Sequence, residues 1–243
     1  MFGAELIGAP RFVCKADEVH VWRVALALNR KELSAVAAVL SSEEFDHGSG
    51  FRCETLRCRW MAAHGALRMI LAAYTEMAPA DLCFIAEPTG KPKLVAADIS
   101  FNLTHTEHLA FVAIAAGGLV GIDAEVVHPE FPWECIGRAF FAREEVGAIY
   151  QLAPELRTRA FYSCWTRKEA YLKALGFGFQ AALDKFQVAV GPDEPLLLRM
   201  DGDPGQAEQW SLVDLSEAGV AVALATNPSK PVARRFEFSV AQH

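Results

Sequence analysis

The chain has 243 residues, 52% of them hydrophobic, and a formal net charge of −7. It is long enough for one large hydrophobic core or two small ones, and its acidic balance argues against nucleic acid as the main partner. It contains no apolar stretch of about 18 residues, so no membrane span is expected. Residues 1–10 lack the basic cluster of a secretory signal. Because the six cysteines show no metal-ligand spacing, we interpret them as reduced thiols of a cytoplasmic protein.

The first half of the chain predicts a strand, a long helix and then a run of strands. Residues 19–24 alternate as a strand does, and residues 54–74 carry an apolar stripe at helical spacing. Further strands are expected around residues 82–85, 99–103 and 109–115.

The second half repeats this plan. It predicts a strand at residues 120–127, followed by helices at residues 143–152 and 154–175. Pro154 separates the two helices, since proline suits a helix start and ends the helix before it. Strands follow around residues 186–190, 210–215, 220–226 and 235–240.

The repeated order indicates an α+β protein with two similar lobes related by a pseudo-twofold axis. The junction is expected at Ala116-Gly117-Gly118, which gives an N-terminal lobe of residues 1–117 and a C-terminal lobe of residues 118–243. If the lobes pack face to face, the cleft between them is the natural ligand site.

Two segments of the second half combine carboxylates with a lysine. A strand would point Asp123 and Glu125 to the same side, and a helix would place Glu169 and Lys173 on one face. Mg²⁺ prefers a few carboxylates, phosphate oxygens and water, so this set suggests Mg²⁺-dependent chemistry on a phosphate ester. The alternative is ordinary surface acids. Asp123 weakens that alternative because it follows an apolar run, and a buried carboxylate requires a cation or a hydrogen-bond donor.

Polar residues of the first half are candidates for binding phosphate. The turn Gly90-Lys91-Pro92 would present Lys91 at the start of a strand, and Thr104 and a protonated His105 follow in residues 100–106. The alternatives are a solvated turn lysine and a structural histidine. Arg59 and Arg68 share the long helix, where each either reaches into a cleft or extends along a solvated face.

Residues 138–145 place two adjacent phenylalanines between basic residues. Phe140 and Phe141 cannot both face the core of one helix, so one of them is exposed for a partner or the segment is irregular. Glu145 falls at a helix start, where a carboxylate is favoured by the helix dipole; its functional alternative is an extra acid near the metal. The chain has no P-loop, no dinucleotide-binding glycine motif, no nucleophile elbow and no zinc-protease motif.

These segments together resemble the Sfp-type 4′-phosphopantetheinyl transferases. The order and spacing of the matching segments are specific, and the match covers nearly the whole chain. The segments are Gly90-Lys91-Pro92, residues 101–106, Gly121-Ile122-Asp123-Ala124-Glu125, and residues 165–169 with Lys173. The resemblance implies two similar lobes with coenzyme A between them. It also implies transfer of the phosphopantetheine arm to a serine of an apo carrier protein, with release of adenosine 3′,5′-bisphosphate.

Roles follow from the resemblance residue by residue. Asp123, Glu125 and Glu169 would hold Mg²⁺, or Mn²⁺, on the pyrophosphate of coenzyme A. Glu169 would also accept the proton of the carrier serine, directly or through water, and Lys173 would neutralise the pyrophosphate. The phosphates and the nucleotide would be held by Arg59, Lys91, Thr104 and His105. The carrier is expected to dock near Arg138, Phe140, Phe141 and Arg143.

Two departures from the family pattern stand out. Thr104 takes the place of a serine but retains the hydroxyl group. Family members often carry basic residues in the stretch that corresponds to residues 41–48, whereas this chain is acidic at residues 43–46 and offers only His47 there. This departure concerns the coenzyme A contacts of the N-terminal lobe and leaves the chemistry of the carboxylates untouched.

Three hypotheses follow. The first is an active, monomeric phosphopantetheinyl transferase that serves an acyl or peptidyl carrier protein in fatty-acid or secondary-metabolite biosynthesis. The second is a non-catalytic module that binds coenzyme A or a carrier protein; the presence of all three carboxylates and Lys173 argues against it. The third is another Mg²⁺-dependent phosphotransferase.

Overall fold

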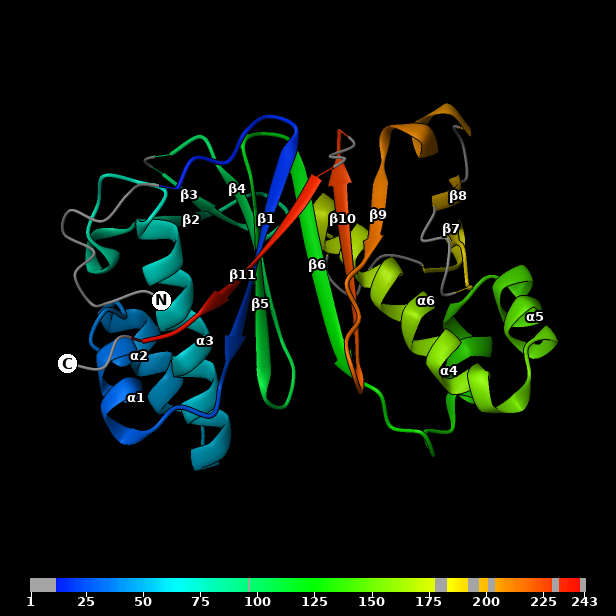
Figure 1. The fold of residues 1–243 in the computed structure, drawn as a ribbon, viewed down its shortest axis with the longest axis horizontal. Coiled ribbons are helices and arrows are strands. Elements are labelled where there is room, and N and C mark those ends of the chain that lie inside the picture. The colour runs from blue at the N-terminus through cyan, green and yellow to red at the C-terminus, as the bar shows by residue number, and fades with distance from the viewer. Residues whose placement is uncertain are drawn as a thin grey trace. The chain divides into compact units, whose positions relative to one another are not determined.

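The computed structural model describes residues 12–95, 97–177, 183–191, 197–200, 204–228 and 232–240. The chain forms two compact units. The first unit comprises Met1–Ala86, Pro92–Gly117 and Ala233–His243, and the second comprises Glu87–Lys91 and Gly118–Val232. Helices and antiparallel sheets occur in both units, which confirms the α+β class (Figure 1). The similarity of two lobes and a cleft between them stay predictions.

The first unit contains a four-stranded sheet with the order β11-β1-β5-β4. Its strands are β1 (Glu18–Ala25), β4 (Ser100–His105), β5 (Leu109–Ala115) and β11 (Val232–Phe238). β5 pairs antiparallel with both β1 and β4, so that Val112 lies opposite Trp22 on one side and Leu103 on the other. The sequence pattern places the last strand in the C-terminal half, whereas β11 lies beside β1 in this sheet.

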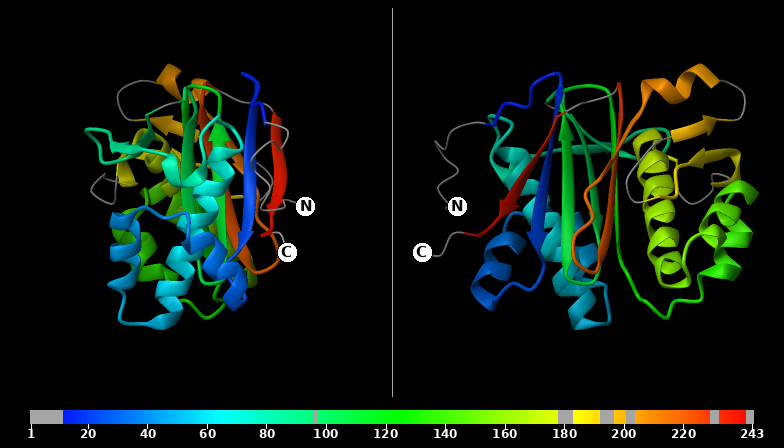
Figure 2. Two further views of the ribbon diagram at one scale, coloured as in Figure 1. Left: turned by 90° about the vertical axis from the view of Figure 1, so that its left-hand side faces the viewer. Right: turned by 45° about the vertical axis from the view of Figure 1, so that its right-hand side comes forward.

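Three helices cover one face of this sheet, as Figure 2 shows. They are α1 (Arg30–Ala37), α2 (Ser42–Ser49) and α3 (Glu54–Ala72). The apolar stripe of α3 packs in the core with Trp22 and Val112, and the stripe includes Leu67, Ile70 and Leu71. α1 and α2 each begin with a capping box, which stabilises short helices that carry no strong apolar stripe.

A small hairpin of β2 (Phe84–Ala86) and β3 (Pro92–Leu94) completes the first unit, together with the short 3₁₀ helix η1 (Pro79–Asp81). The turn predicted at residues 90–92 joins the two strands. Gly90 has a φ angle of +88°, and its N–H group donates to the Glu87 carbonyl at 2.7 Å. A positive φ angle favours glycine, which explains this residue at the turn.

The second unit is built on a three-stranded antiparallel sheet with the order β6-β10-β9. Its strands are β6 (Leu119–Val126), β9 (Ser211–Asp214) and β10 (Val220–Asn227). The long helix α6 (Pro154–Leu175) packs on β6 and β10. α6 has the predicted bounds: it begins at a proline and ends at Gly176, whose φ angle of +79° forms a left-handed cap.

Shorter elements surround α6. They are α4 (Trp133–Phe140), α5 (Arg143–Gln151), the 3₁₀ helices η2 (Leu183–Lys185) and η3 (Pro204–Gln209), and the hairpin of β7 (Phe186–Val188) and β8 (Leu197–Met200). The core of the second unit contains Phe161, Tyr171, Leu172 and Phe186. Nearly every face of α6 is covered, because buried residues run from Ala160 to Ala174.

Gly121 lets β6 and α6 approach closely. A Cβ atom at this position would lie 2.1 Å from the Ala170 carbonyl oxygen and 2.4 Å from the Ala174 amide nitrogen. Only glycine fits such a contact between two backbones. The glycine of the segment 121–125 therefore brings the carboxylates of β6 against the helix that carries Glu169 and Lys173.

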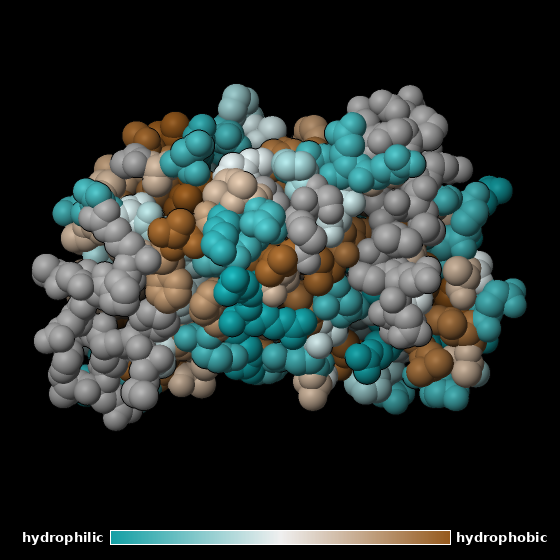
Figure 3. All heavy atoms as spheres, turned by 45° about the horizontal axis from the view of Figure 1, so that its top comes forward, coloured by the Kyte–Doolittle hydropathy of each residue, from teal (hydrophilic) through white to brown (hydrophobic). Residues whose placement is uncertain are grey.

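The surface mixes residue types. On the face shown in Figure 3, hydrophobic residues are interspersed with hydrophilic ones. Over the described residues, the exposed large hydrophobic side chains include Val13, Ile85 and Val95. Such scattered positions are ordinary on a protein surface. All six cysteines are free. In the part of the chain that is described, no helix is both long and apolar enough to cross a bilayer.

Candidate active site

Four side chains predicted to act together gather in the second unit. Asp123 and Glu125 come from β6, and Glu169 and Lys173 come from α6. The Lys173 ammonium donates to Asp123 Oδ1 at 2.5 Å. Asp123 and Glu169 are buried, with relative exposures of 4% and 5%, while Glu125 and Lys173 are half-buried. The strand alternation and the four-residue helical spacing thus bring these four side chains into one region of the second unit, and their roles stay predictions.

Two glutamates of this cluster have raised pKa values. Burial raises the pKa of Glu125 to about 7, repulsion by Asp123 adds to the rise, and Lys173 opposes it. The pKa of Glu169 is also raised to about 7, first by burial and then by Asp123, again against Lys173. A single lysine therefore does not neutralise the cluster, and a further cation would restore the ionised form of both glutamates.

Carboxylate oxygens of the kind in this cluster are the ligands that a hard metal ion prefers. Glu169 Oε1 is buried and has no hydrogen-bond partner among the described residues, which is costly unless a ligand supplies one. In the described part of the chain, no three His, Cys, Asp or Glu side chains are gathered closely enough to hold a metal by themselves. Mg²⁺ commonly binds one or two carboxylates together with substrate phosphates and water, so a complete protein cage is not required.

The raised pKa values predict how stability depends on pH in the presence of EDTA. The unfolded carboxyls titrate near 4.5 and the folded ones near 7, so the folded state binds more protons between these values. The melting temperature should therefore fall as the pH rises from 5 to 8. The lowered pKa of His64, about 4, opposes this trend below pH 6.5, and the lowered pKa of Lys91, about 8, opposes it near pH 8 and above. The fall should therefore be clearest between about pH 6.5 and 7.5.

Thermal unfolding followed by circular dichroism checks this expectation. Asp123→Asn removes the repulsion and should flatten the slope, while added Mg²⁺ should raise the melting temperature most at pH 8. Burial, the larger cause of both shifts, remains in Asp123→Asn, so the deciding variant is Glu125→Gln combined with Glu169→Gln: an unchanged slope there would remove these carboxylates as its cause.

Lys91 lies in the second unit but makes contacts of a structural kind. Its ammonium donates to the Val120 carbonyl at 2.8 Å and to the Ala174 carbonyl at 3.0 Å. It thus links the turn of residues 87–91 to β6 and to the last turn of α6, where a cation is favoured by the helix dipole. Burial lowers its pKa to about 8. Its role in holding coenzyme A stays a prediction.

The other predicted nucleotide contacts belong to the first unit. Arg59 is half-buried on α3, Thr104 is buried on β4, and His105 is exposed at the end of the same strand. Their roles also stay predictions. Arg68, which shares the helix with Arg59, is buried and structural: it pairs with Glu44 at 2.5 Å and donates to the Pro79 and Leu82 carbonyls.

Glu145 has a structural role that the sequence identifies only in part. The predicted helix cap is confirmed, because one carboxylate oxygen accepts from the Ala142 amide at 2.9 Å. The other oxygen accepts from the Val188 amide at 2.8 Å and lies 2.9 Å from the Lys168 ammonium. Both oxygens are engaged in packing α5, α6 and β7 together, and these contacts do not support the interpretation as an extra acid near the metal.

Sequence reasoning missed two cations of α6. Lys168 is fully buried and donates to the Leu183 and Phe186 carbonyls. Arg167 is equally buried and donates to the Ala189 and Gly191 carbonyls and to Asp214. Their only signal in the sequence is their place in the middle of a long helix beside Glu169. By anchoring α6 to the segments that follow it, they fix the face on which Glu169 lies.

In the segment predicted to contact the carrier, one of the two adjacent phenylalanines is buried and the other is exposed. Phe141 is buried at 5% relative exposure, while Phe140 at the end of α4 is 49% exposed. Arg138 is exposed and donates to the Tyr150 hydroxyl at 2.9 Å.

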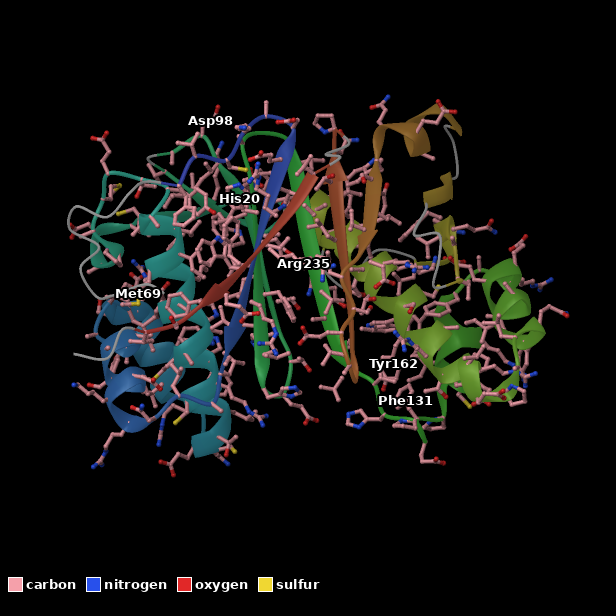
Figure 4. All side chains as sticks on the ribbon, in the orientation of Figure 1. His20, Met69, Asp98, Phe131, Tyr162 and Arg235 are labelled. Atoms are coloured by element: carbon pink, nitrogen blue, oxygen red, sulfur yellow. The ribbon has the colours of Figure 1, made fainter. Side chains whose placement is uncertain are left out.

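An apolar cavity of about 180 Å³ adjoins Glu125 in the same unit. Its lining includes Phe131 and Tyr162, which lie close together in Figure 4, with ring centroids 5.6 Å apart.

The sequence of this chain is similar to those of known proteins. Residues 119–225 match the model of the 4′-phosphopantetheinyl transferase superfamily. The chain is 35% identical over 223 residues to the 4′-phosphopantetheinyl transferase HetI of Nostoc sp.. The matched region covers 88% of this chain and 91% of HetI. It is 32% identical over 188 residues to slr0495 of Synechocystis sp., with coverages of 76% and 75%. It is also 32% identical over 121 residues to the transferase AcpT of Salmonella typhimurium, with coverages of 49% and 59%.

Proposed function

Because the chain belongs to the 4′-phosphopantetheinyl transferase superfamily, we propose that this enzyme transfers the 4′-phosphopantetheine arm of coenzyme A to a serine of an apo carrier protein. The serine oxygen forms a bond to the phosphorus that carries the arm, and the bond to the leaving oxygen of adenosine 3′,5′-bisphosphate breaks. The observation that carries the proposal is the cluster of Asp123, Glu125 and Glu169 around Lys173.

The side chains of the cluster would have different roles in the transfer. Asp123, Glu125 and Glu169 would hold Mg²⁺, which stabilises negative charge on the pyrophosphate when it is bound. Lys173 adds a second positive charge toward the phosphate oxygens, where charge grows in the transition state. Glu169 would accept the serine proton, directly or through one water, as the general base.

The surroundings of the cluster also support the proposal. The cavity beside Glu125 is lined mainly by aromatic and aliphatic side chains, including Phe161 and Trp165. It would accept the uncharged arm that is joined to the transferred phosphate. Phosphoryl transfer depends mostly on positioning and charge, so no further nucleophile of the enzyme is required.

Intact mass spectrometry of an apo carrier protein tests the function. The carrier is incubated with the enzyme, coenzyme A and Mg²⁺, and a parallel sample contains EDTA. We expect a gain of one phosphopantetheine arm only in the sample with metal. Binding of coenzyme A by calorimetry without any mass gain across several carriers would instead favour a binding module. Absence of both would contradict the proposal.

The carrier is proposed to dock beside α4 and α5. Exchanging Arg138 and Arg143 together for glutamate should raise the KM for the carrier about tenfold, since like charges would then meet an acidic partner. Coenzyme A binding should be unchanged, because neither residue belongs to the carboxylate cluster. Steady-state kinetics with varied carrier concentration gives this KM. As a matched control, Arg30 and Lys31 of the first unit are exchanged together for glutamate. Equal KM values for the two double variants would place the docking surface elsewhere.

A further inference from the structure

The turn of residues 87–91 is seated on the C-terminal end of α6 in the second unit. The turn is closed by the Glu87 amide, which donates to the Lys91 carbonyl at 2.9 Å. Gly176, the residue that caps α6, faces this turn. A Cβ atom at Gly176 would lie 2.3 Å from Thr89 Oγ1 and 3.4 Å from Lys91 Cβ. The turn and the end of the helix are therefore in direct contact.

One ammonium group joins the two elements that carry the carboxylate cluster. Lys91 Nζ donates to the Val120 carbonyl of β6 at 2.8 Å and to the Ala174 carbonyl of α6 at 3.0 Å. These two hydrogen bonds form the Lys91 bridge. Val120 lies three residues before Asp123, and Ala174 directly follows Lys173. The bridge therefore connects backbone segments that adjoin the paired side chains of the cluster.

The Lys91 bridge lies at a close contact between β6 and α6. Gly121 follows Val120 and lets β6 approach the Ala170 carbonyl and the Ala174 amide. A van der Waals contact of this kind limits how near the two elements come but is not directional. Hydrogen bonds have preferred directions, so two of them from one ammonium also fix the position of α6 along β6. The glycine thus sets the separation of the two elements, and Lys91 sets their alignment.

The surroundings of Lys91 direct its charge toward the protein. Its side chain is half-buried, and burial lowers its pKa to about 8, while Glu87 of the same turn raises it. β6 and α6 face the ammonium with backbone carbonyls, so two of its three N–H groups are used within the protein. The Ala174 carbonyl lies in the last turn of α6, where carbonyls lack a partner within the helix and the dipole favours a cation.

We propose that Lys91 is a positioning residue for the transfer: its ammonium aligns α6 with β6 and thereby places the Lys173 ammonium beside Asp123. The inference rests on the proposed function, because it concerns the alignment of the cluster that acts on the phosphate. It differs from a role in holding coenzyme A. A residue that only binds the substrate changes KM, whereas a residue that aligns the cluster changes kcat.

Kinetics of Lys91→Met test the positioning role. Methionine keeps the length of the side chain and removes the ammonium, so kcat should fall about tenfold, as expected for a small misplacement of reacting groups. The KM for coenzyme A should stay within about twofold of the native value. Lys91→Arg keeps a cation with N–H donors and should recover most of the lost kcat. The matched control is Lys93→Met, because Lys93 is exposed on β3 and its replacement should change neither constant.

Hydrogen exchange at the end of α6 gives a readout that does not depend on activity. Amides of residues 170–177 should exchange about tenfold faster in Lys91→Met than in the native protein, because the last turn of the helix opens more readily without the bridge. Lys93→Met should leave this exchange unchanged. Exchange in α3, which belongs to the first unit, serves as the internal reference that separates local opening from a loss of global stability.

The outcomes separate the bridge from the proposed function. A raised KM for coenzyme A with a native kcat in Lys91→Met would overturn the inference and assign Lys91 to substrate binding, with the function left in place. Faster exchange with a native kcat would show a structural bridge only and would also overturn the positioning role. If the native protein showed no transfer, the proposed function would fail together with the kinetic role of Lys91, while faster exchange would still establish the bridge.

Discussion

Transfer of the phosphopantetheine arm is expected to fall by about a thousandfold or more when Asp123 or Glu169 is replaced by alanine. Both carboxylates belong to the buried cluster, and Asp123 also holds Lys173 in place. The fold should persist, because each substitution relieves repulsion among the carboxylates. Discontinuous mass spectrometry of the carrier gives the rates, and circular dichroism checks the fold.

Glu155→Ala is the matched control for Glu169→Ala. Glu155 lies on the same helix but is exposed in its first turn, so its removal should leave the rate within about twofold of the native value. A native rate in either cluster variant would refute the metal assignment. A native rate in Lys173→Ala would remove that lysine from the site.

Replacing Gly121 by alanine is expected to lower the free energy of unfolding by about 3 kcal/mol. The new methyl group would overlap backbone atoms of Ala170 and Ala174, and backbone atoms cannot rotate away as a side chain can. β6 and α6 would have to separate, which would draw Asp123 and Glu125 away from Glu169. The folded fraction should therefore lose transfer activity as well.

Gly147→Ala provides the control for this substitution. Gly147 lies within α5, and a Cβ atom there would meet nothing within 4 Å. Alanine at a helix interior should stabilise the protein by about 1 kcal/mol. Urea unfolding of the two variants measures the contrast. Equal urea midpoints for the two variants would show that β6 and α6 accommodate the added methyl group without loss of stability.

Strong local signals let the sequence predict many elements. The bounds of α6 follow from a proline at its start and a glycine cap at its end, and β5 follows from an apolar run at Leu109–Ala115. The cluster follows from two periodicities: alternation along β6 and the four-residue spacing on α6. These patterns are local, so they can be recognised in the sequence without knowledge of tertiary contacts.

Other features depend on contacts that no local pattern reveals. α1, α2 and α4 have eight residues each and were not predicted, because their apolar surface is small. Lys91 has the sequence context of a phosphate ligand, yet its ammonium donates to two backbone carbonyls. The sequence indicates a helix-start role for Glu145 and no pairing with Lys168, but the fold buries the two as a pair. Such pairings arise between distant segments and become visible only once the chain is folded.

The position of β11 has a consequence for how the chain is made. The second unit is inserted into the first, because residues on both sides of it build the sheet that contains β1 and β11. During synthesis the ribosome completes β6, α6 and β10 before it reaches residues 232–238. One edge of β1 therefore stays unpaired until the last strand of the chain is made. Until β11 arrives, that edge is open to pairing with another chain.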